Sequence, residues 1–120
     1  MLNFTEPLKI YLFKNRNIVN LNIRVSDNVV NAYNFDTEIF EKLLDKWQDP
    51  DGVDLKVGKH HWYIQHKTSG PRPQRKPADY VRISISVGNG QYFHYRVGWD
   101  DMHKMEHEYF YQKRHEMYWD

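Results

Sequence analysis

The feature that most limits the fold is a pair of alternating segments around a short glycine-rich turn. Residues 80–87 (YVRISISV) and 91–97 (QYFHYRV) flank Gly88-Asn89-Gly90. Alternation of apolar and polar residues with a period of two is typical of a β-strand that buries one face. The intervening glycines and asparagine favour a tight reversal of the chain. We therefore predict a β-hairpin at this position.

The length of the turn decides which residues face each other. A two-residue turn would place Ile83 opposite Arg96 and mix apolar with charged side chains. A three-residue loop pairs Val87 with Gln91 and keeps one face apolar, which is the arrangement that a half-buried sheet requires. The sequence therefore predicts a three-residue loop.

Four further segments have periodic patterns. Residues 8–14 and 18–25 alternate like a second hairpin, and residues 60–67 resemble another strand. A helical period begins after Asp36, a candidate N-cap, and predicts a helix over residues 36–48. A second helix is expected over residues 100–118, because acids begin this segment and basic residues end it.

The predicted element order is ββαβββα, in a single domain spanning residues 1–120. We expect an α+β fold with one antiparallel sheet of about five strands and both helices packed on one face, which buries both sets of apolar residues. The second helix should turn Met102, Met105, Tyr109, Phe110 and Met117 towards the sheet. The predicted covered face of the sheet consists of Leu8, Ile10, Leu12, Val19, Leu21, Ile23, Trp62, Ile64, Val81, Ile83, Ile85, Phe93, Tyr95 and Val97.

Charge is unevenly distributed along a chain whose net charge is only +1. Residues 26–55 contain two basic and eight acidic side chains, whereas residues 56–96 contain eight basic and one acidic. A fold that gathers the basic segment on one side would attract anions more than the net charge indicates. Mutual attraction between oppositely charged elements is the alternative interpretation.

The open face of the predicted sheet combines aromatic and basic residues. Aromatic rings stack on nucleobases, and Arg and Lys neutralise phosphates, so this mixture is typical of surfaces that bind single strands or nucleotides. It is also found on protein interfaces and on ordinary exposed strands. The basic loop over residues 67–76 would extend this surface. The candidate binding residues are Arg24, Tyr63, Lys67, Arg72, Arg75, Lys76, Tyr80, Arg82, Tyr92, His94, Arg96 and Arg114.

These residues favour a small non-catalytic binding module for an anionic partner, which could be a nucleic acid, a nucleotide or an acidic protein surface. A protein-binding inhibitor or adaptor without a nucleic-acid role is one alternative. The other is a metal-dependent hydrolase, because His103, Glu106 and His107 match an H-x-x-E-H pattern, although two histidines provide no convincing third ligand. The chain has no cysteine and no phosphate-binding glycine loop, so the sequence indicates no cofactor and favours a binding protein over an enzyme.

The number of aromatic residues predicts self-association. Several aromatic side chains fall outside the predicted covered face, and exposed aromatic clusters usually mark an interface. We expect a homodimer formed through the open sheet face or through the C-terminal helix. No long apolar run is present, so a cytoplasmic protein without a membrane role is expected.

Overall fold

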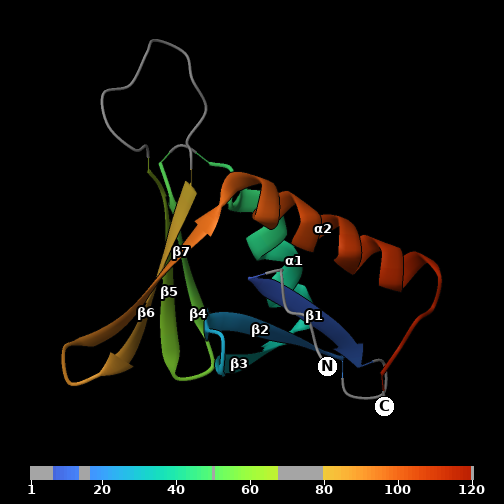
Figure 1. Ribbon diagram of the computed structural model, residues 1–120, viewed down its shortest axis with the longest axis horizontal. Coiled ribbons are helices and arrows are strands. Elements are labelled where there is room, and N and C mark those ends of the chain that lie inside the picture. Colours follow the sequence, from blue (N-terminus) through green and yellow to red (C-terminus); the bar gives the residue numbers. More distant parts are fainter. Residues whose placement is uncertain (1–6, 14–16, 50, 68–79, 120) are drawn as a thin grey trace, which may run out of the picture. The chain divides into compact units, whose positions relative to one another are not determined.

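The computed structural model of the protein describes residues 7–13, 17–49, 51–67 and 80–119. These residues have an α+β fold with seven strands in two antiparallel sheets and two helices (Figure 1). The strands are β1 (Leu8–Phe13), β2 (Ile18–Ser26), β3 (Val29–Asp36), β4 (Val53–Val57), β5 (His60–Lys67), β6 (Tyr80–Gly88) and β7 (Gln91–Gly98). The helices are α1 (Thr37–Lys46) and α2 (Trp99–Arg114).

The chain forms two compact units. The first consists of residues 1–40 and 100–120, and the second of residues 41–99. The first unit therefore contains the three-stranded sheet, in the order β1-β2-β3, and nearly all of α2. The second contains the four-stranded sheet, in the order β4-β5-β6-β7. Neither helix among the described residues is long and apolar enough to cross a membrane.

The prediction of one five-stranded sheet is wrong. Two strands, β3 and β4, were not expected, and the strands belong to two sheets. In β3 only Phe35 is buried, so its sequence lacks the alternation that marks a strand with one covered face. In β4 the alternation extends over only five residues, directly after a turn at Gly52. β3 pairs with β2, and β4 pairs with β5, in each case across a short turn. The local sequence pattern does not indicate to which of the two sheets either strand belongs.

The core of the first unit lies between the three-stranded sheet and α2. Met102, Met105 and Tyr109 on α2 are buried. The Tyr109 ring contacts that of Phe40 with centroids 5.0 Å apart. Phe35 of β3 and the apolar residues of β1 and β2 also belong to this core, the latter being Leu8, Ile10, Leu12, Val19, Leu21 and Ile23. The period of two predicted for these strands is thus confirmed.

A buried glutamine joins α2 to the edge of this sheet. The Gln112 side chain is 2% exposed, and its amide nitrogen donates to the carbonyl of Ile10 over 3.0 Å. Its amide oxygen accepts a hydrogen bond of 3.1 Å from the backbone N–H of Leu12. Next to it, the Trp119 N–H donates to the Leu12 carbonyl over 2.8 Å. One side chain and one backbone amide therefore cover the C-terminal half of the free edge of β1.

The end of α2 differs from the sequence prediction. The helix ends at Arg114 rather than near residue 118, because Glu116 adopts a positive φ of 52°. The Met117 N–H then donates to the Gln112 carbonyl over 2.9 Å, a hydrogen-bond pattern that closes helices. Phe110 and Met117 were expected in the core but are 42% and 43% exposed. Met117 lies beyond the helix, so its extrapolated position on a helical face does not apply.

The core of the second unit is rich in tryptophan. Trp47, which follows α1, and Trp62 on β5 are both fully buried. The His66 ring hydrogen-bonds the Trp47 carbonyl over 2.7 Å and packs edge-on against the Trp99 ring, with centroids 5.0 Å apart. Leu43 and Leu44 of α1 are buried as its helical period predicts. His66 therefore has a structural role in this core.

The β6–β7 hairpin has a two-residue turn and an adjacent β-bulge. Gly88 pairs with Gln91, so the turn consists of two residues, Asn89 and Gly90, both with positive φ. A bulge between Ser86 and Gly88 then shifts the register by one residue. The predicted three-residue loop is wrong, yet the bulge restores the predicted face pairing. As a result, Ile83 lies opposite Tyr95 and Val81 lies opposite Val97.

Every residue predicted for the covered face is buried except Phe93, which is 51% exposed. Phe93 is on the predicted side of the sheet, because it pairs with the buried Ile85. However, β7 is an edge strand and Phe93 lies near its turn, so the ring has a strand neighbour on only one side. The alternation of side chains between the two faces of a strand does not by itself predict whether a side chain near the end of an edge strand is covered.

Candidate functional site

Six of the predicted binding residues lie together on the four-stranded sheet. They alternate with the buried residues of β5, β6 and β7 and therefore project from the opposite face. His61 and Ser84 occupy the same face, although the sequence prediction of the site omitted them. We call this surface the aromatic–basic face. It comprises His61, Tyr63, Tyr80, Arg82, Ser84, Tyr92, His94 and Arg96.

The strand register separates the rings from the cations on this face. Ser84 of β6 lies between Tyr63 and His94, which are its partners on the two neighbouring strands. One step further from the β6–β7 turn, Arg82 lies directly opposite Arg96. The face therefore has a ring-bearing part near that turn and a cationic part further along the same strands.

The rings near the turn stand in two nearly parallel pairs. His61 and Tyr63 on β5 have centroids 6.2 Å apart and an interplanar angle of 18°. Tyr92 and His94 on β7 have centroids 6.0 Å apart and an angle of 11°. Tyr63 on β5 and Tyr92 on β7, the two strands that flank β6, have ring centroids 6.3 Å apart. Tyr92 is 47% exposed, so this part of the face presents ring surface to a ligand.

Polar contacts hold the middle of the face in place. The Ser84 hydroxyl lies 2.8 Å from Nδ1 of His94, and the Arg82 guanidinium lies 3.2 Å from the same nitrogen. A guanidinium only donates, so Nδ1 of a neutral His94 is the acceptor and the ring proton is on Nε2. His94 therefore offers a donor on the side of its ring away from Ser84.

The cationic part contains a like-charge pair. Arg82 and Arg96 are direct cross-strand partners, an arrangement that ordinarily destabilises a sheet. The guanidinium of Arg96 lies 3.9 Å from the centre of the Tyr80 ring, and this cation–π contact orients it. The acid Asp54 is on β4, where it pairs with Tyr63 and contacts His61. It is therefore in a different row from the two arginines.

Tyr63 is uncharged at neutral pH. Desolvation by its neighbours, the negative charge of Asp54 and the Tyr92 hydroxyl together raise the pKa of Tyr63 above its ordinary value of 10.0. The phenol therefore adds no negative charge to the face, and its ring and hydroxyl remain available for stacking and hydrogen bonding.

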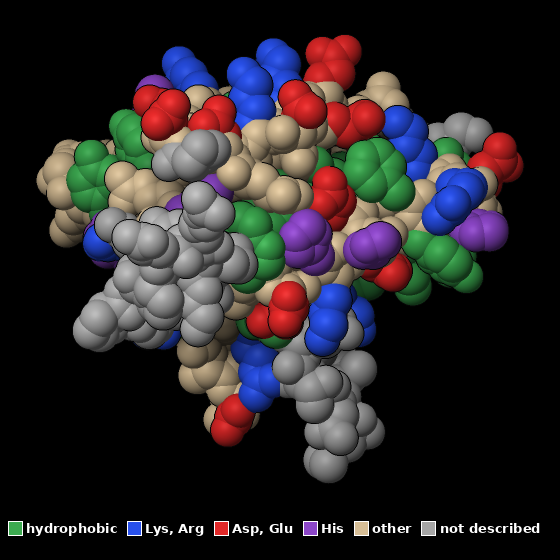
Figure 2. Space-filling view, turned by 90° about the horizontal axis from the view of Figure 1, so that it is seen from above, with side chains coloured by type: hydrophobic (Ala, Val, Ile, Leu, Met, Phe, Trp, Pro, Cys, Tyr) green, Lys and Arg blue, Asp and Glu red, His purple; other side chains and the backbone are tan. Residues whose placement is uncertain are grey.

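Arg24 and Arg114 belong to the first unit and not to the sheet that carries this face. Arg24 lies on the three-stranded sheet, where its guanidinium pairs with Asp27. Arg114 ends α2, beside Phe110 and Lys113 around a surface pocket. The backbone of Lys67 pairs with Tyr80 at the end of β5. Arg72, Arg75 and Lys76 lie outside the described residues. In the view of Figure 2, acidic and basic side chains of the described residues lie among one another.

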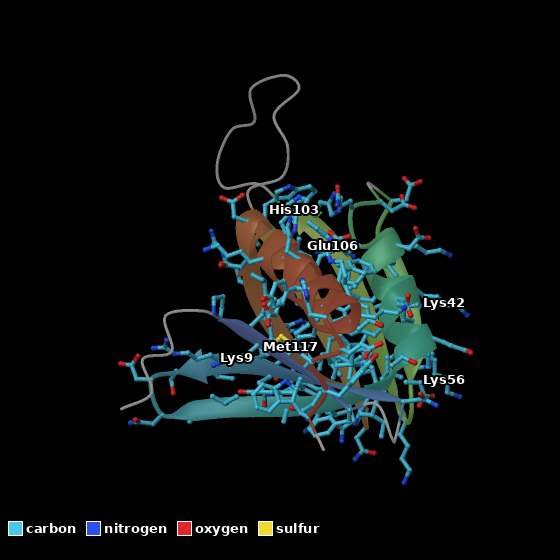
Figure 3. The ribbon with its side chains drawn as sticks, turned by 90° about the vertical axis from the view of Figure 1, so that its right-hand side faces the viewer. Lys9, Lys42, Lys56, His103, Glu106 and Met117 are labelled. Carbon is cyan, nitrogen blue, oxygen red and sulfur yellow. The ribbon has the colours of Figure 1, made fainter. Side chains whose placement is uncertain are left out.

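The histidines of α2 do not form a metal site within the described part of the chain. His103 and Glu106 lie near the start of α2 (Figure 3), with Nδ1 and Oε1 3.8 Å apart. No group of three His, Asp or Glu side chains is close enough there to hold a metal ion. Among these residues, the hydrolase alternative is therefore supported only by the contact between His103 and Glu106, without a third metal ligand.

The alternation of the sequence assigns His61 and Ser84 to the open face, but the predicted binding residues did not include them, and the buried glutamine was missed. The signal for His61 and Ser84 was present, because both share the parity of Tyr63 and Arg82. The role of Gln112 had no local signal, because its partners Ile10 and Leu12 are about a hundred residues away in the sequence. The chain matches no protein-family model, no curated protein and no solved structure in our comparisons.

Proposed function

We propose that this chain is a non-catalytic binding module that holds single-stranded nucleic acid on the aromatic–basic face. The apposition of Arg82 and Arg96 beside the four rings carries this proposal. Two guanidinium groups in direct cross-strand positions repel each other, and a bound phosphate offsets that repulsion. The adjacent rings provide surfaces on which bases stack.

The arrangement favours single strands over duplexes. Stacking on Tyr63 or Tyr92 requires a base whose face is accessible, and the bases of a duplex are already stacked on each other. The cationic part lies on the same strands as the rings, so a phosphate at Arg82 and Arg96 leaves the neighbouring bases near the ring-bearing part. His94 can donate to a base or a phosphate from Nε2.

Salt dependence of binding tests the electrostatic part of the proposal. Fluorescence anisotropy with a labelled single-stranded oligonucleotide, repeated over a range of salt concentrations, gives the slope of log affinity against log salt. Two phosphates at the arginines predict a slope of about −1.4, because each contributes about −0.7 in a single strand. Arg96→Gln should reduce the slope by about 0.7, and Arg24→Gln, an equal change of charge on the other sheet, should leave it unchanged.

The same assay discriminates between partners. If no oligonucleotide binds even at low salt, the nucleic-acid proposal is wrong. If a duplex binds as tightly as a single strand, the rings have no role. If only an acidic protein surface competes for the face and affinity responds weakly to salt, the chain is an inhibitor or adaptor of the kind considered above.

A further inference from the structure

Two side chains of β6 share one nitrogen of His94. The Ser84 hydroxyl lies 2.8 Å from Nδ1 of this ring, and the Arg82 guanidinium lies 3.2 Å from it. A guanidinium only donates, so the contact with Arg82 requires a lone pair on Nδ1 and therefore a neutral ring. A hydroxyl both donates and accepts, so the contact with Ser84 is compatible with a neutral or a charged ring. The two contacts therefore respond differently to a proton.

Protonation of His94 at Nδ1 removes the hydrogen-bond acceptor of Arg82. The new N–H donates to the hydroxyl oxygen of Ser84, and the guanidinium then lies beside a second positive charge. Repulsion between the two cations favours rotamers that direct the guanidinium away from the ring. A neutral His94 therefore holds Arg82, and a charged His94 releases it for another acceptor.

The other titratable or charged groups near His94 on the described sheet are two tyrosines and an arginine. Tyr92 and Arg96 share its face of β7, and Tyr63 lies on β5, on the far side of β6. Tyr63 is uncharged at neutral pH because its pKa is raised. The acid Asp54 is one strand further away, on β4. A proton on His94 therefore raises the positive charge of a face that already carries two arginines.

We infer that the aromatic–basic face takes up a proton on His94 when it binds phosphate, so that its affinity for a single strand rises as the pH falls. This inference rests on the proposed function and adds its regulation. Histidine is the side chain whose charge ordinarily changes between about pH 5 and pH 8. A bound phosphate accepts from the released Arg82 and balances the charge of His94, so the proton and the phosphate each favour binding of the other.

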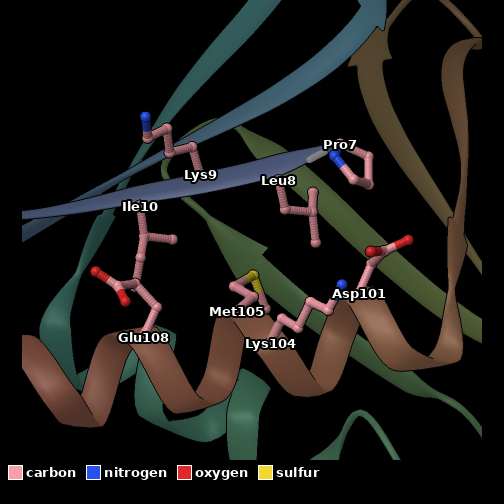
Figure 4. Close-up of a pocket in the computed structure, with 8 residues that line it drawn as sticks. All are labelled: Pro7, Leu8, Lys9, Ile10, Asp101, Lys104, Met105 and Glu108. Atoms are coloured by element: carbon pink, nitrogen blue, oxygen red, sulfur yellow. The ribbon is translucent and has the colours of Figure 1, made fainter. Parts of the chain in front are cut away.

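The coupling between His94 and Arg82 can be measured without a nucleic acid. In isotope-labelled protein, the ring signals of His94 and the guanidinium carbon signal of Arg82 are followed from about pH 8 to about pH 5. The buried methyl groups of Leu8 and Ile10, which line the pocket beside α2 (Figure 4), should remain in place and show that the fold persists. We expect the His94 and Arg82 signals to change with one midpoint, and His94→Gln to abolish the response of Arg82. An Arg82 signal that does not follow the His94 ring contradicts the inference, whether or not the face binds nucleic acid.

The second measurement is the affinity for a short oligothymidylate at constant salt, because thymine bases do not titrate in this pH range. The affinity of the wild type should rise about tenfold between about pH 8 and about pH 5.5, since the contacts of His94 with phosphate become charge-assisted. His94→Gln cannot take up the proton, so its affinity should be the same at both pH values.

His61→Gln is the matched control. His61 belongs to the same face, but its Nδ1 lies 3.5 Å from the carboxylate of Asp54 rather than beside an arginine. This variant should bind more weakly at both pH values, because it loses a ring, and should keep the rise in affinity. The inference is contradicted if the rise survives His94→Gln or disappears with His61→Gln. Binding without any pH dependence contradicts this inference alone, whereas an absence of binding at both pH values shows that the proposed function is wrong as well.

Discussion

Arg82 and Arg96 occupy directly opposite positions on β6 and β7, so two residues of the same charge are cross-strand partners. The Tyr80 ring orients Arg96, and the His94 ring accepts a hydrogen bond from Arg82. Both arginines are therefore held on the face, with the Arg82 guanidinium turned towards His94 and the Arg96 guanidinium turned towards Tyr80. Such an arrangement costs stability unless an anion is bound, and residues that bind ligands often have such a cost.

Arg82→Thr should stabilise the protein and weaken its binding. Threonine keeps the strand propensity of the position and removes the repulsion, so the free energy of unfolding should rise by about 0.5 kcal/mol at low salt. Urea denaturation at two salt concentrations measures this gain, which should shrink as salt screens the wild-type repulsion. A variant that is less stable than wild type at low salt would contradict the like-charge interpretation.

Gln112→Leu should be one of the most destabilising single changes in the first unit. Leucine has a similar volume but leaves the Ile10 carbonyl and the Leu12 N–H at a buried position without their amide partner. We expect a loss of about 2–3 kcal/mol in the free energy of unfolding, measured by urea denaturation. Exposure of the edge should also promote association of partly unfolded chains, visible by light scattering. A loss below about 0.5 kcal/mol would show that water replaces the amide.

The raised pKa of Tyr63 predicts a dependence of stability on alkaline pH. Its contribution to stability is fully present below pH 10.0, the value in the unfolded chain, and is lost as pH rises through the higher pKa of the folded state. Tyr63→Phe removes this titration. The stability difference between wild type and variant should therefore be constant below pH 10.0 and should change in favour of the variant above it. Urea midpoints across this range check the sign, and parallel curves throughout would refute it.

Self-association is expected through α2 and the residues that follow it. Exposed apolar side chains gather there, since Phe110, Tyr111, Met117 and Trp119 are each more than 40% exposed. Sedimentation of wild type beside Phe110→Lys and Tyr92→Ala separates this surface from the aromatic–basic face. We expect only Phe110→Lys to shift a dimer towards monomer. A shift with Tyr92→Ala instead would place the interface on the sheet and remove that face as a nucleic-acid surface.

Much of the fold followed from local pattern. The strands of residues 80–87 and 91–97 and the helix after Asp36 have strong periodicity, because apolar residues recur on one side of each, although Phe93 on that side of β7 is exposed. Strands β3 and β4 were missed because the first has one buried residue and the second is short. The bulge at the β6–β7 turn was not predicted, because it depends on the register of the two strands and the geometry of the turn together. The pattern of either strand alone does not contain this information.

The candidate face was predictable because its residues alternate with those of the core. Once Ile83 and Ile85 are assigned to the interior, Arg82 and Ser84 must project from the other side. That Arg24 belongs to a different sheet from this face was not predictable, because alternation assigns a residue to a face and does not assign its strand to a sheet. The contacts of Gln112 likewise depend on the tertiary structure alone.

The most direct test of the central claim is a residue-resolved titration of isotope-labelled protein with a short single-stranded oligonucleotide at low salt. The account predicts that backbone and ring signals of Tyr63, Ser84, Tyr92, His94 and Arg96 change together, while those of Arg24 and Arg114 remain in place. Signal changes confined to Arg24, Arg114 or the exposed residues of α2, or no change at saturating oligonucleotide, would contradict it.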